Sequence, residues 1–204
     1  MSGKAVILDR DGTLIDVVRD EETGAISVAF HPSQLRVLAG ALDGLRLLQD
    51  AGYVLAIATN QPAPAKGQFS ADAVARTNDA LVLLLAAEGI AIARVAVCMH
   101  HPEGGAGGDA SLVGPCDCRK PQPGLVTGLL RELDVDAASS WIIGDSAGDV
   151  EAGRAAGVRT ALVFASNRCE LCPLRAGVSA LAPRALPDVS GATLTEIAKR
   201  ILAA

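Results

Sequence analysis

The sequence predicts an α/β fold, in which one parallel β-sheet is covered by helices on both faces. Short apolar runs alternate along the chain with longer segments of helical periodicity. Strand–helix–strand alternation of this kind produces parallel sheets. Half of the 204 residues are hydrophobic but only 2% are aromatic, so we expect a core of leucine, valine, isoleucine and alanine. The length suits a single domain, which we place at residues 1–204.

Five apolar runs of strand length are each bounded by polar or turn-forming residues. Such runs fit strands that are buried on both faces, as the strands of a parallel sheet are. The predicted strands are residues 5–8, 53–58, 92–98, 141–143 and 160–164.

The first helix is predicted from the spacing of its leucines. Residues 40–51 carry Leu42, Leu45 and Leu48 at helical spacing, and Gly52 follows as a stop signal. One face of this helix is therefore expected to lie against the sheet.

Capping residues predict the remaining helices. Ser70 is placed to cap the start of a helix that Gly89 ends. Residues 123–133 begin with a proline, which is favoured in the first turn of a helix. A short helix at residues 147–156 and a last one at residues 194–202 complete the pattern.

Three longer connections lack a clear period. Residues 13–39 are long for a loop and are expected to carry a small hairpin flap. Residues 103–114 are rich in glycine and are expected to be mobile, and residues 165–183 are irregular. No insertion is large enough to form a cap domain, so we expect a fairly open site.

Two carboxylates follow the first strand in the stretch Asp9-Arg10-Asp11-Gly12-Thr13. Side chains at positions i and i+2 of an extended chain point the same way, so Asp9 and Asp11 can face one site. They repel each other unless a cation lies beside them. This indicates a Mg²⁺ site at which one carboxylate attacks and the other moves a proton. The alternative is a strand that simply ends in an Asp-Gly turn.

Polar residues also follow two other strands. Thr59 and Asn60 offer a hydroxyl and an amide that suit phosphate oxygens, although such a pair also commonly ends strands. Asp145 follows the fourth strand and Asp149 lies in the first turn of the next helix, so both can approach one cation. The alternative role for Asp149 is stabilisation of the helix dipole. Because ligands bind at the carboxyl ends of parallel strands, Asp9, Thr59 and Asp145 are expected at one site.

Arg119 and Lys120 follow the third strand and its glycine-rich loop. A fixed ammonium group could neutralise charge on a transferring phosphoryl group. A guanidinium group could bind a second anionic group with two hydrogen bonds. Taken alone, the pair is better explained as two solvated basic side chains.

Two short groups of cysteine and histidine bracket the glycine-rich loop. Cys98, His100, Cys116 and Cys118 could form a closed tetrahedral Zn²⁺ site, and three thiolates disfavour Mg²⁺ or Ca²⁺. His101 is an alternative ligand, and reduced buried thiols are the alternative to a metal site. A structural zinc would tie the loop at its base and fix the basic pair that follows it.

Together these motifs resemble the four ordered motifs of the haloacid dehalogenase superfamily, and the match covers nearly the whole chain. The resemblance implies a Rossmann-like sheet, bound Mg²⁺ and a covalent aspartyl-phosphate. It implies that Asp9 is the nucleophile, that Asp11 is the proton donor and then the base for water, and that Thr59 and Lys120 hold the phosphoryl group. The implied Mg²⁺ ligands are Asp9, the Asp11 carbonyl and Asp145, with Asp149 in support of the metal or of Lys120. An acid at position 11 implies a phosphatase, because the pumps of the superfamily carry a threonine there.

The cysteine pattern further resembles that of the D-glycero-D-manno-heptose 1,7-bisphosphate 7-phosphatases, a zinc-containing group. Histidinol-phosphate phosphatases share the zinc pattern but usually have a shorter loop between the ligand pairs, and they are the nearest alternative. The resemblance implies a small phosphorylated sugar as the substrate, in nucleotide-activated heptose biosynthesis, with Asn60, Arg119 and Lys66 as substrate-binding residues. Lys66 and Ser146 depart from the family pattern, which leaves the preferred anomer open. A non-catalytic phosphosugar-binding protein is the alternative of another class.

Composition argues against several other functions. The net charge is −5 and the basic residues are scattered, which argues against a nucleic-acid partner. The longest apolar run, residues 80–87, is too short to cross a membrane, and we find no secretory signal before Asp9. Five cysteines without such a signal indicate a reducing compartment, so we expect a cytoplasmic protein. We also expect a monomer. Cys169 and Cys172 belong to no motif that we can assign.

Overall fold

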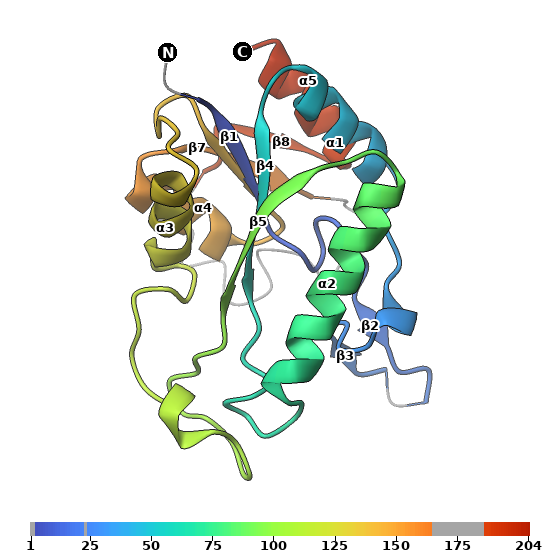
Figure 1. Ribbon diagram of the computed structural model, residues 1–204, viewed down its shortest axis with the longest axis vertical. Coiled ribbons are helices and arrows are strands. Elements are labelled where there is room, and N and C mark those ends of the chain that lie inside the picture. The colour runs from blue at the N-terminus through green and yellow to red at the C-terminus, as the bar shows by residue number, and fades with distance from the viewer. Residues whose placement is uncertain (1–2, 23, 165–185) are drawn as a thin grey trace.

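A six-stranded sheet forms the centre of the molecule (Figure 1). The computed structural model describes residues 3–22, 24–164 and 186–204, so the expectations for residues 165–183 and for Cys169 and Cys172 lie outside the described residues. In chain order the strands are β1 (Ala5–Leu8), β4 (Val54–Asn60), β5 (Ile92–Cys98), β6 (Trp141–Gly144), β7 (Arg159–Val163) and β8 (Val189–Gly191). Their order across the sheet is β5-β4-β1-β6-β7-β8, and every pairing is parallel.

Helices cover both faces of the sheet, as the sequence predicts (Figure 1). Within the described residues the helices are α1 (Ala41–Asp50), α2 (Ala71–Ala87), α3 (Gly124–Glu132), α4 (Ala147–Ala156) and α5 (Leu194–Leu202). Val6 and Leu8 of β1 belong to the core that α1, α2 and α5 close, whereas Ile7 belongs to the core under α3 and α4. This alternation follows from the two-residue period of a strand. The predicted fold class is confirmed.

The hairpin expected after the first strand is present. β2 (Val18–Arg19) pairs in antiparallel fashion with β3 (Ile26–Ser27), apart from the main sheet. Beyond β3, the ring of Phe30 stacks on that of Phe69, with the ring centroids 3.6 Å apart. This contact joins the base of the hairpin to the segment that leads into α2.

The edge strand β8 was not predicted. Its three residues, a valine, a serine and a glycine, carry no hydrophobic pattern that would distinguish a strand from a loop. Asp188 holds the strand in register, because its Oδ2 accepts hydrogen bonds from the amide (2.7 Å) and the hydroxyl (2.9 Å) of Thr160 in β7. A tertiary contact therefore forms this strand rather than its own propensity.

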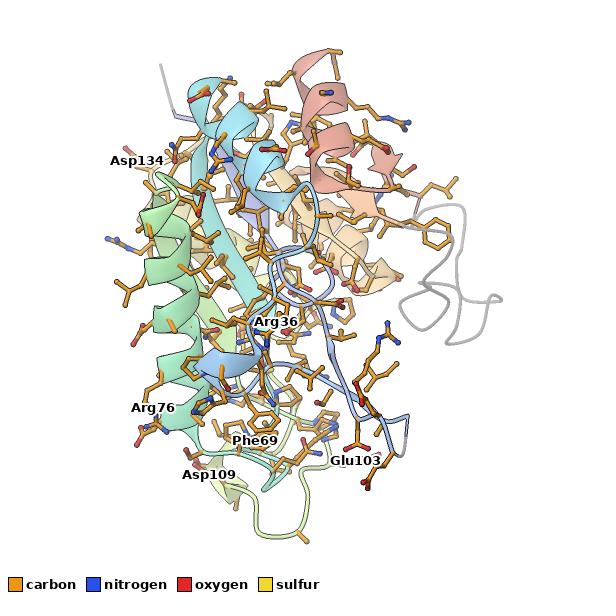
Figure 2. The ribbon with its side chains drawn as sticks, turned by 90° about the vertical axis from the view of Figure 1, so that its right-hand side faces the viewer. Arg36, Phe69, Arg76, Glu103, Asp109 and Asp134 are labelled. Carbon is orange, nitrogen blue, oxygen red and sulfur yellow. The ribbon has the colours of Figure 1, made fainter. Side chains whose placement is uncertain are left out.

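The glycine-rich loop, expected to be mobile, is packed against residues 62–68. The amide of Asp109 donates to the carbonyl of Pro64 at 3.0 Å. A Cβ atom on Gly108 would lie 1.9 Å from the carbonyl oxygen of Ala65, and one on Gly105 would lie 2.5 Å from that of Lys66. Glycine is needed here because the two backbones touch. Figure 2 shows Phe69, Glu103 and Asp109 at this same end of the molecule.

Among the helices in the described ranges, none is both long and apolar enough to cross a bilayer.

Candidate active site

Three adjacent strands, β4, β1 and β6, bring the predicted site residues to one edge of the sheet. Asp9 directly follows β1, Thr59 lies near the end of β4, and Asp145 directly follows β6. They meet there because parallel strands all point their carboxyl ends to the same edge. A pocket of about 200 Å³ opens at this edge and is lined by Asp9, Asp11, Val28, Thr59, Asn60, Lys120, Ser146, Gly148 and Asp149.

Lys120 is the central cation of this pocket. Its Nζ atom lies 2.7 Å from Oδ1 of Asp9 and 2.6 Å from Oδ1 of Asp149, and it donates to the carbonyl of Ala58 at 2.7 Å. The side chain is only 4% exposed. Burial by itself would lower the pKa of Lys120, but Asp149 and Asp9 together outweigh it and raise that pKa above its ordinary value. Lys120 is therefore a permanently charged, fixed ammonium group, and not the solvated residue that the motif alone would suggest.

Asn60 fixes the backbone of Lys120. The Asn60 Nδ2 group donates to the carbonyl of Lys120 at 3.0 Å, and the Lys120 amide donates to Asn60 Oδ1 at 3.1 Å. Asn60 also lines the pocket. The structure thus gives this side chain a positioning contact, and the predicted contact with substrate stays a prediction.

An acidic cluster surrounds the Asp9 carboxylate. One oxygen each of Asp9, Asp145 and Asp149 lie within 4.8 Å of one another. Burial and the other carboxylates raise the pKa of Asp145 to about 8, and burial raises that of Asp9 to about 6 although Lys120 opposes it. Carboxylates that resist ionisation at this spacing fit a hard divalent cation, which would remove their repulsion. The donor set is therefore suited to Mg²⁺.

Two glycines allow these carboxylates to approach. A Cβ atom on Gly12 would lie 2.2 Å from Oδ2 of Asp145, and one on Gly144 would lie 2.1 Å from Cγ of Asp149. Gly12 also has a positive φ of 80°, which L side chains rarely adopt. The Asp-Gly turn and the acidic site, treated as alternatives in the sequence, are therefore both present.

Asp149 contacts both the start of α4 and Lys120. Its Oδ2 accepts hydrogen bonds from the amide (3.2 Å) and the hydroxyl (2.5 Å) of Ser146, which caps the N-terminus of α4. Its Oδ1 faces Lys120. The capping contact fixes the carboxylate that holds the lysine.

Asp11 is held by two residues that sequence reasoning missed. Oδ2 of Asp11 accepts hydrogen bonds from Nε of Arg10 at 2.9 Å and from Nε2 of Gln61 at 2.7 Å. Gln61 also donates to Oγ1 of the buried Thr59 at 2.9 Å. The Asp11 side chain is therefore turned toward Arg10 and Gln61, and it is not part of the acidic cluster. The sequence signal for these contacts was an arginine between two carboxylates at the end of a buried strand. A buried charge needs partners, so other polar side chains had to lie near it.

The predicted zinc ligands converge. Ligand atoms of Cys98, His100, Cys116 and Cys118 lie within 4.8 Å of one another, and the sulfurs of Cys98 and Cys118 are 3.0 Å apart. Burial raises the pKa of Cys98 and of Cys118, which disfavours their thiolate forms. A bound cation would stabilise those thiolates. Three thiols and an imidazole form the donor set of a closed zinc site.

His101, the alternative ligand, is used elsewhere. Its Nδ1 accepts hydrogen bonds from the amides of Glu103 (3.3 Å) and Gly104 (3.0 Å) and so shapes the start of the glycine-rich loop. Burial, and then the charges of Lys66 and Arg119, lower the pKa of His101. Lys66 and Arg119 thus lie near one imidazole, but neither lines the 200 Å³ pocket.

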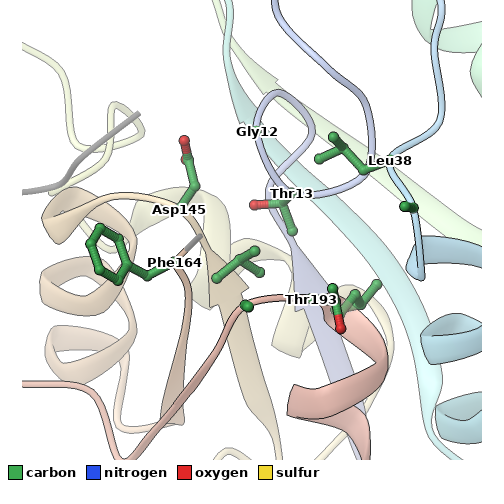
Figure 3. Close-up of a pocket in the computed structure, with 10 residues that line it drawn as sticks. Gly12, Thr13, Leu38, Asp145, Phe164 and Thr193 are labelled. Atoms are coloured by element: carbon green, nitrogen blue, oxygen red, sulfur yellow. The ribbon is translucent and has the colours of Figure 1, made fainter. Parts of the chain in front are cut away.

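A separate cavity of about 190 Å³ lies against the Asp-Gly turn (Figure 3). It is lined by Gly12, Thr13, Leu38, Ala39, Asp145, Val163, Phe164, Ala192, Thr193 and Leu194. The buried hydroxyl of Thr13 has no hydrogen-bond partner among the described residues. Most of the lining is small or apolar, and Asp145 reaches this cavity from the acidic cluster.

Comparison with known proteins agrees with this geometry. A family model described as HAD-hydrolase-like matches residues 117–170. The D-glycero-beta-D-manno-heptose-1,7-bisphosphate 7-phosphatase of Pasteurella multocida is 31% identical over 81% of this chain and 83% of its own length. The enzyme of the same name from Rhodopseudomonas palustris is 39% identical over 76% of this chain and 79% of its own.

A solved structure resembles the whole chain. It is the D,D-heptose 1,7-bisphosphate phosphatase of B. bronchiseptica, crystallised with magnesium and phosphate. The structural match covers 98% of this chain and 98% of that one, with 28% sequence identity and a TM-score of 0.74. The arrangement around Lys120 and these similarities lead to one conclusion: the chain belongs to the haloacid dehalogenase-like hydrolases and, within them, to the family of the D-glycero-D-manno-heptose 1,7-bisphosphate 7-phosphatases.

Proposed function

We propose that this protein is a Mg²⁺-dependent phosphatase that removes the C7 phosphate of D-glycero-β-D-manno-heptose 1,7-bisphosphate. The observation that carries the proposal is the buried Lys120, 2.7 Å from the Asp9 carboxylate at the end of β1, with Asp145 and Asp149 gathered beside it. The names of the relatives support the sugar and the β anomer, which the sequence left open. The product would serve nucleotide-activated heptose biosynthesis.

The positions of the side chains support the following reaction. An Asp9 carboxylate oxygen attacks phosphorus, the phosphorus–oxygen bond to the sugar breaks, and Asp11 gives a proton to the leaving oxygen. Water then attacks the phosphorus of the aspartyl-phosphate and gives a proton to Asp11, which restores Asp9 and releases phosphate. Lys120 and the hydroxyl of Thr59 hold the phosphoryl oxygens and offset their charge.

Magnesium fits the acidic cluster. We assign Asp9, the carbonyl of Asp11 and Asp145 as its ligands, with Asp149 in support, because three of these residues already bring carboxylate oxygens within 4.8 Å of one another. When bound, Mg²⁺ supplies positive charge that neutralises the carboxylates and the phosphate dianion. Lys120 supplies the second positive charge from the protein itself.

We further propose one structural Zn²⁺, held by Cys98, His100, Cys116 and Cys118. The site is closed by four protein ligands, so its role is to hold the chain and not to bind substrate. Cys118 is followed directly by Arg119 and Lys120, and Arg119 also donates from Nη1 to the carbonyl of His100 at 3.3 Å. The zinc site therefore fixes the approach of the chain to the catalytic lysine.

We assign substrate selection to three residues. Asn60 lines it, and Lys66 and Arg119 lie near His101, where they offer two positive charges for the remaining anionic phosphate. Histidinol phosphate has a single phosphate and a cationic amine, so it would be a poorer match for two cations. This charge argument favours the bisphosphate over the nearest alternative substrate.

The test is phosphate release from both anomers of the heptose 1,7-bisphosphate and from histidinol phosphate, with Mg²⁺ and with chelator. We expect fastest turnover of the β anomer, dependence on Mg²⁺, and a loss of at least about 10³-fold in Asp9→Asn, whose melting temperature should show a folded protein. Equal turnover in Asp9→Asn would refute the nucleophile. A folded protein that releases no phosphate from any of these compounds would support the non-catalytic alternative.

We also propose that the protein acts as a monomer in the cytoplasm. Light scattering coupled to size exclusion would test the first statement, and cell fractionation would test the second.

A further inference from the structure

Arg10 is a fully buried arginine in the middle of the catalytic motif. Its exposed fraction is 0%, although it lies between Asp9 and Asp11 in the sequence. A buried guanidinium group is tolerated only when its charge is paired and its donors are satisfied. The structure provides both, through Asp11 and through two anchors outside the motif.

The anchors fix the plane of the guanidinium group. Nη1 of Arg10 donates to Oδ1 of Asn78 in α2 at 2.7 Å, and Nη2 donates to the carbonyl of Ala29, beyond the hairpin, at 2.9 Å. Asn78 is itself buried. Because these partners come from two separate elements, the guanidinium cannot turn without breaking a buried hydrogen bond.

The two oxygens of Asp11 are held very differently. Oδ2 lies 2.9 Å from both Nε and Nη2 of Arg10 and 2.7 Å from Nε2 of Gln61. Oδ1 has one contact among the hydrogen bonds of the described residues, from Nη2 of Arg10 at 3.2 Å. A carboxylate oxygen has two lone pairs, so Oδ2 is saturated by its donors whereas Oδ1 keeps capacity for a further partner.

We propose that Arg10 and Gln61 orient Asp11 so that Oδ1 is the atom that exchanges the proton. In the first step Oδ1 releases its proton to the leaving oxygen as the phosphorus–oxygen bond breaks. In the second step Oδ1 receives a proton from the attacking water. This inference rests on the proposed function, and it makes Arg10 a positioning residue, since its buried guanidinium contacts Asp11 and not the pocket that holds the substrate.

The two steps allow a test that a purely structural role would not pass. The ratio kcat/KM reports events up to the first irreversible step, which is departure of the leaving group. Phenyl phosphate has a basic leaving oxygen that needs protonation, whereas the oxygen of p-nitrophenyl phosphate leaves readily without it. General acid catalysis contributes about 10²- to 10⁴-fold, so a misplaced Asp11 should affect the first compound more than the second.

The experiment compares wild type, Arg10→Met, Gln61→Met, Asp11→Asn and the double variant Arg10→Met/Asp11→Asn on both aryl phosphates with Mg²⁺. We expect Arg10→Met to lower kcat/KM for phenyl phosphate at least about 10-fold more than for p-nitrophenyl phosphate. Adding Arg10→Met to Asp11→Asn should change kcat/KM less than about 2-fold, because Arg10 acts through Asp11.

Two outcomes overturn the inference. One is an equal loss on both compounds, and the other is a full additional loss when Arg10→Met is placed in the Asp11→Asn protein. If Arg10→Met does not fold, the Gln61→Met variant decides, because it removes a donor to Oδ2 of Asp11 and leaves the buried ion pair intact. An equal loss of kcat/KM on both compounds in Gln61→Met would also overturn the inference. A wild-type protein that hydrolyses neither compound would instead refute the proposed function, so the two failures are distinguishable.

Discussion

The Nζ atom of Lys120 lies 2.7 Å from Oδ1 of Asp9, although 111 positions separate the two residues in the chain. The pair is buried, and Asp149 holds the opposite side of the same ammonium group at 2.6 Å. The lysine therefore offsets part of the charge of both carboxylates, including the one that we propose as the nucleophile, before any substrate arrives. Several properties of the protein depend on this arrangement.

Removal of the Lys120 charge should destabilise the fold. Lys120→Met leaves Asp9 and Asp149 buried without their cation, and breaking a buried pair in this way costs about 3–5 kcal/mol. Urea denaturation would measure the free energy of unfolding, with Mg²⁺ expected to restore part of it. Lys120→Arg is the matched control, since it keeps the charge and should lose less stability. An unchanged free energy of unfolding in Lys120→Met would contradict the structural role of the pair.

The effect of Mg²⁺ on stability should grow with pH. The pKa values of Asp9, about 6, and Asp145, about 8, both exceed the ordinary aspartate value. Their protonated forms therefore favour the metal-free fold below about pH 4, and this stability is lost as the pH rises through 6 and 8. Mg²⁺ binds the ionised forms, and at a hundred times its dissociation constant a ligand adds about 2.7 kcal/mol.

Melting temperatures at about pH 5.5 and pH 8, with and without Mg²⁺, would measure this dependence. The increase caused by Mg²⁺ should be larger at pH 8. Asp145→Asn should weaken the dependence, because it removes the group with the higher pKa. A shift that is equal at both pH values would show that these carboxylates do not bind the ion.

Loss of the zinc site should loosen the glycine-rich loop and lower activity together. We expect metal analysis to find about one zinc per chain, and Cys118→Ser to contain much less. Because Lys120 is two residues beyond Cys118, the variant should also have a lower kcat. A zinc-free Cys116→Ser/Cys118→Ser protein with full stability and full activity would exclude a structural role for the metal.

The close contact between the glycine-rich loop and residues 62–68 can be tested by adding one methyl group. Gly108→Ala would place Cβ 1.9 Å from the Ala65 carbonyl oxygen, and overpacking of this kind costs about 1–3 kcal/mol. Gly128→Ala is the matched control, since its Cβ would meet no atom within 4 Å and lies in α3, where alanine is favoured by about 1 kcal/mol. Urea denaturation should therefore give changes of opposite sign. A loss of equal size in both variants would count against the contact.

Much of the fold could be predicted because local signals agreed with the tertiary structure. The helix predicted to begin after Ser70 is present as α2, Ala71–Ala87, with the Ser70 hydroxyl accepting from the amide of Ala73. β8 could not be predicted, since Asp188 and the neighbouring strand form it and its own residues carry no pattern. Nor could the packing of the glycine-rich loop, because glycine signals both freedom and close contact.

Part of the candidate site could likewise be predicted from the sequence and part could not. Asp9, Thr59 and Asp145 were identifiable from residue type and strand position, whereas Lys120 was assigned through the resemblance of the ordered motifs. The structure brings all four together. The roles of Asn78 and Gln61 could not be identified, because each depends on which distant side chain it meets. Spacing along the chain reveals groups on one strand, whereas hydrogen bonds between elements require the coordinates.

The short last strand has a consequence for shortened forms of the protein. β8 covers the outer edge of β7, and α5, which follows it, lies so close to α1 that a Cβ on Gly44 would be 2.7 Å from the carbonyl carbon of Leu194. A fragment that stops before Val189 would expose a row of unsatisfied amides and carbonyls on β7, together with the apolar surface beneath α5. Such a fragment would retain every proposed catalytic side chain, yet we expect it to self-associate through that open edge rather than remain dispersed.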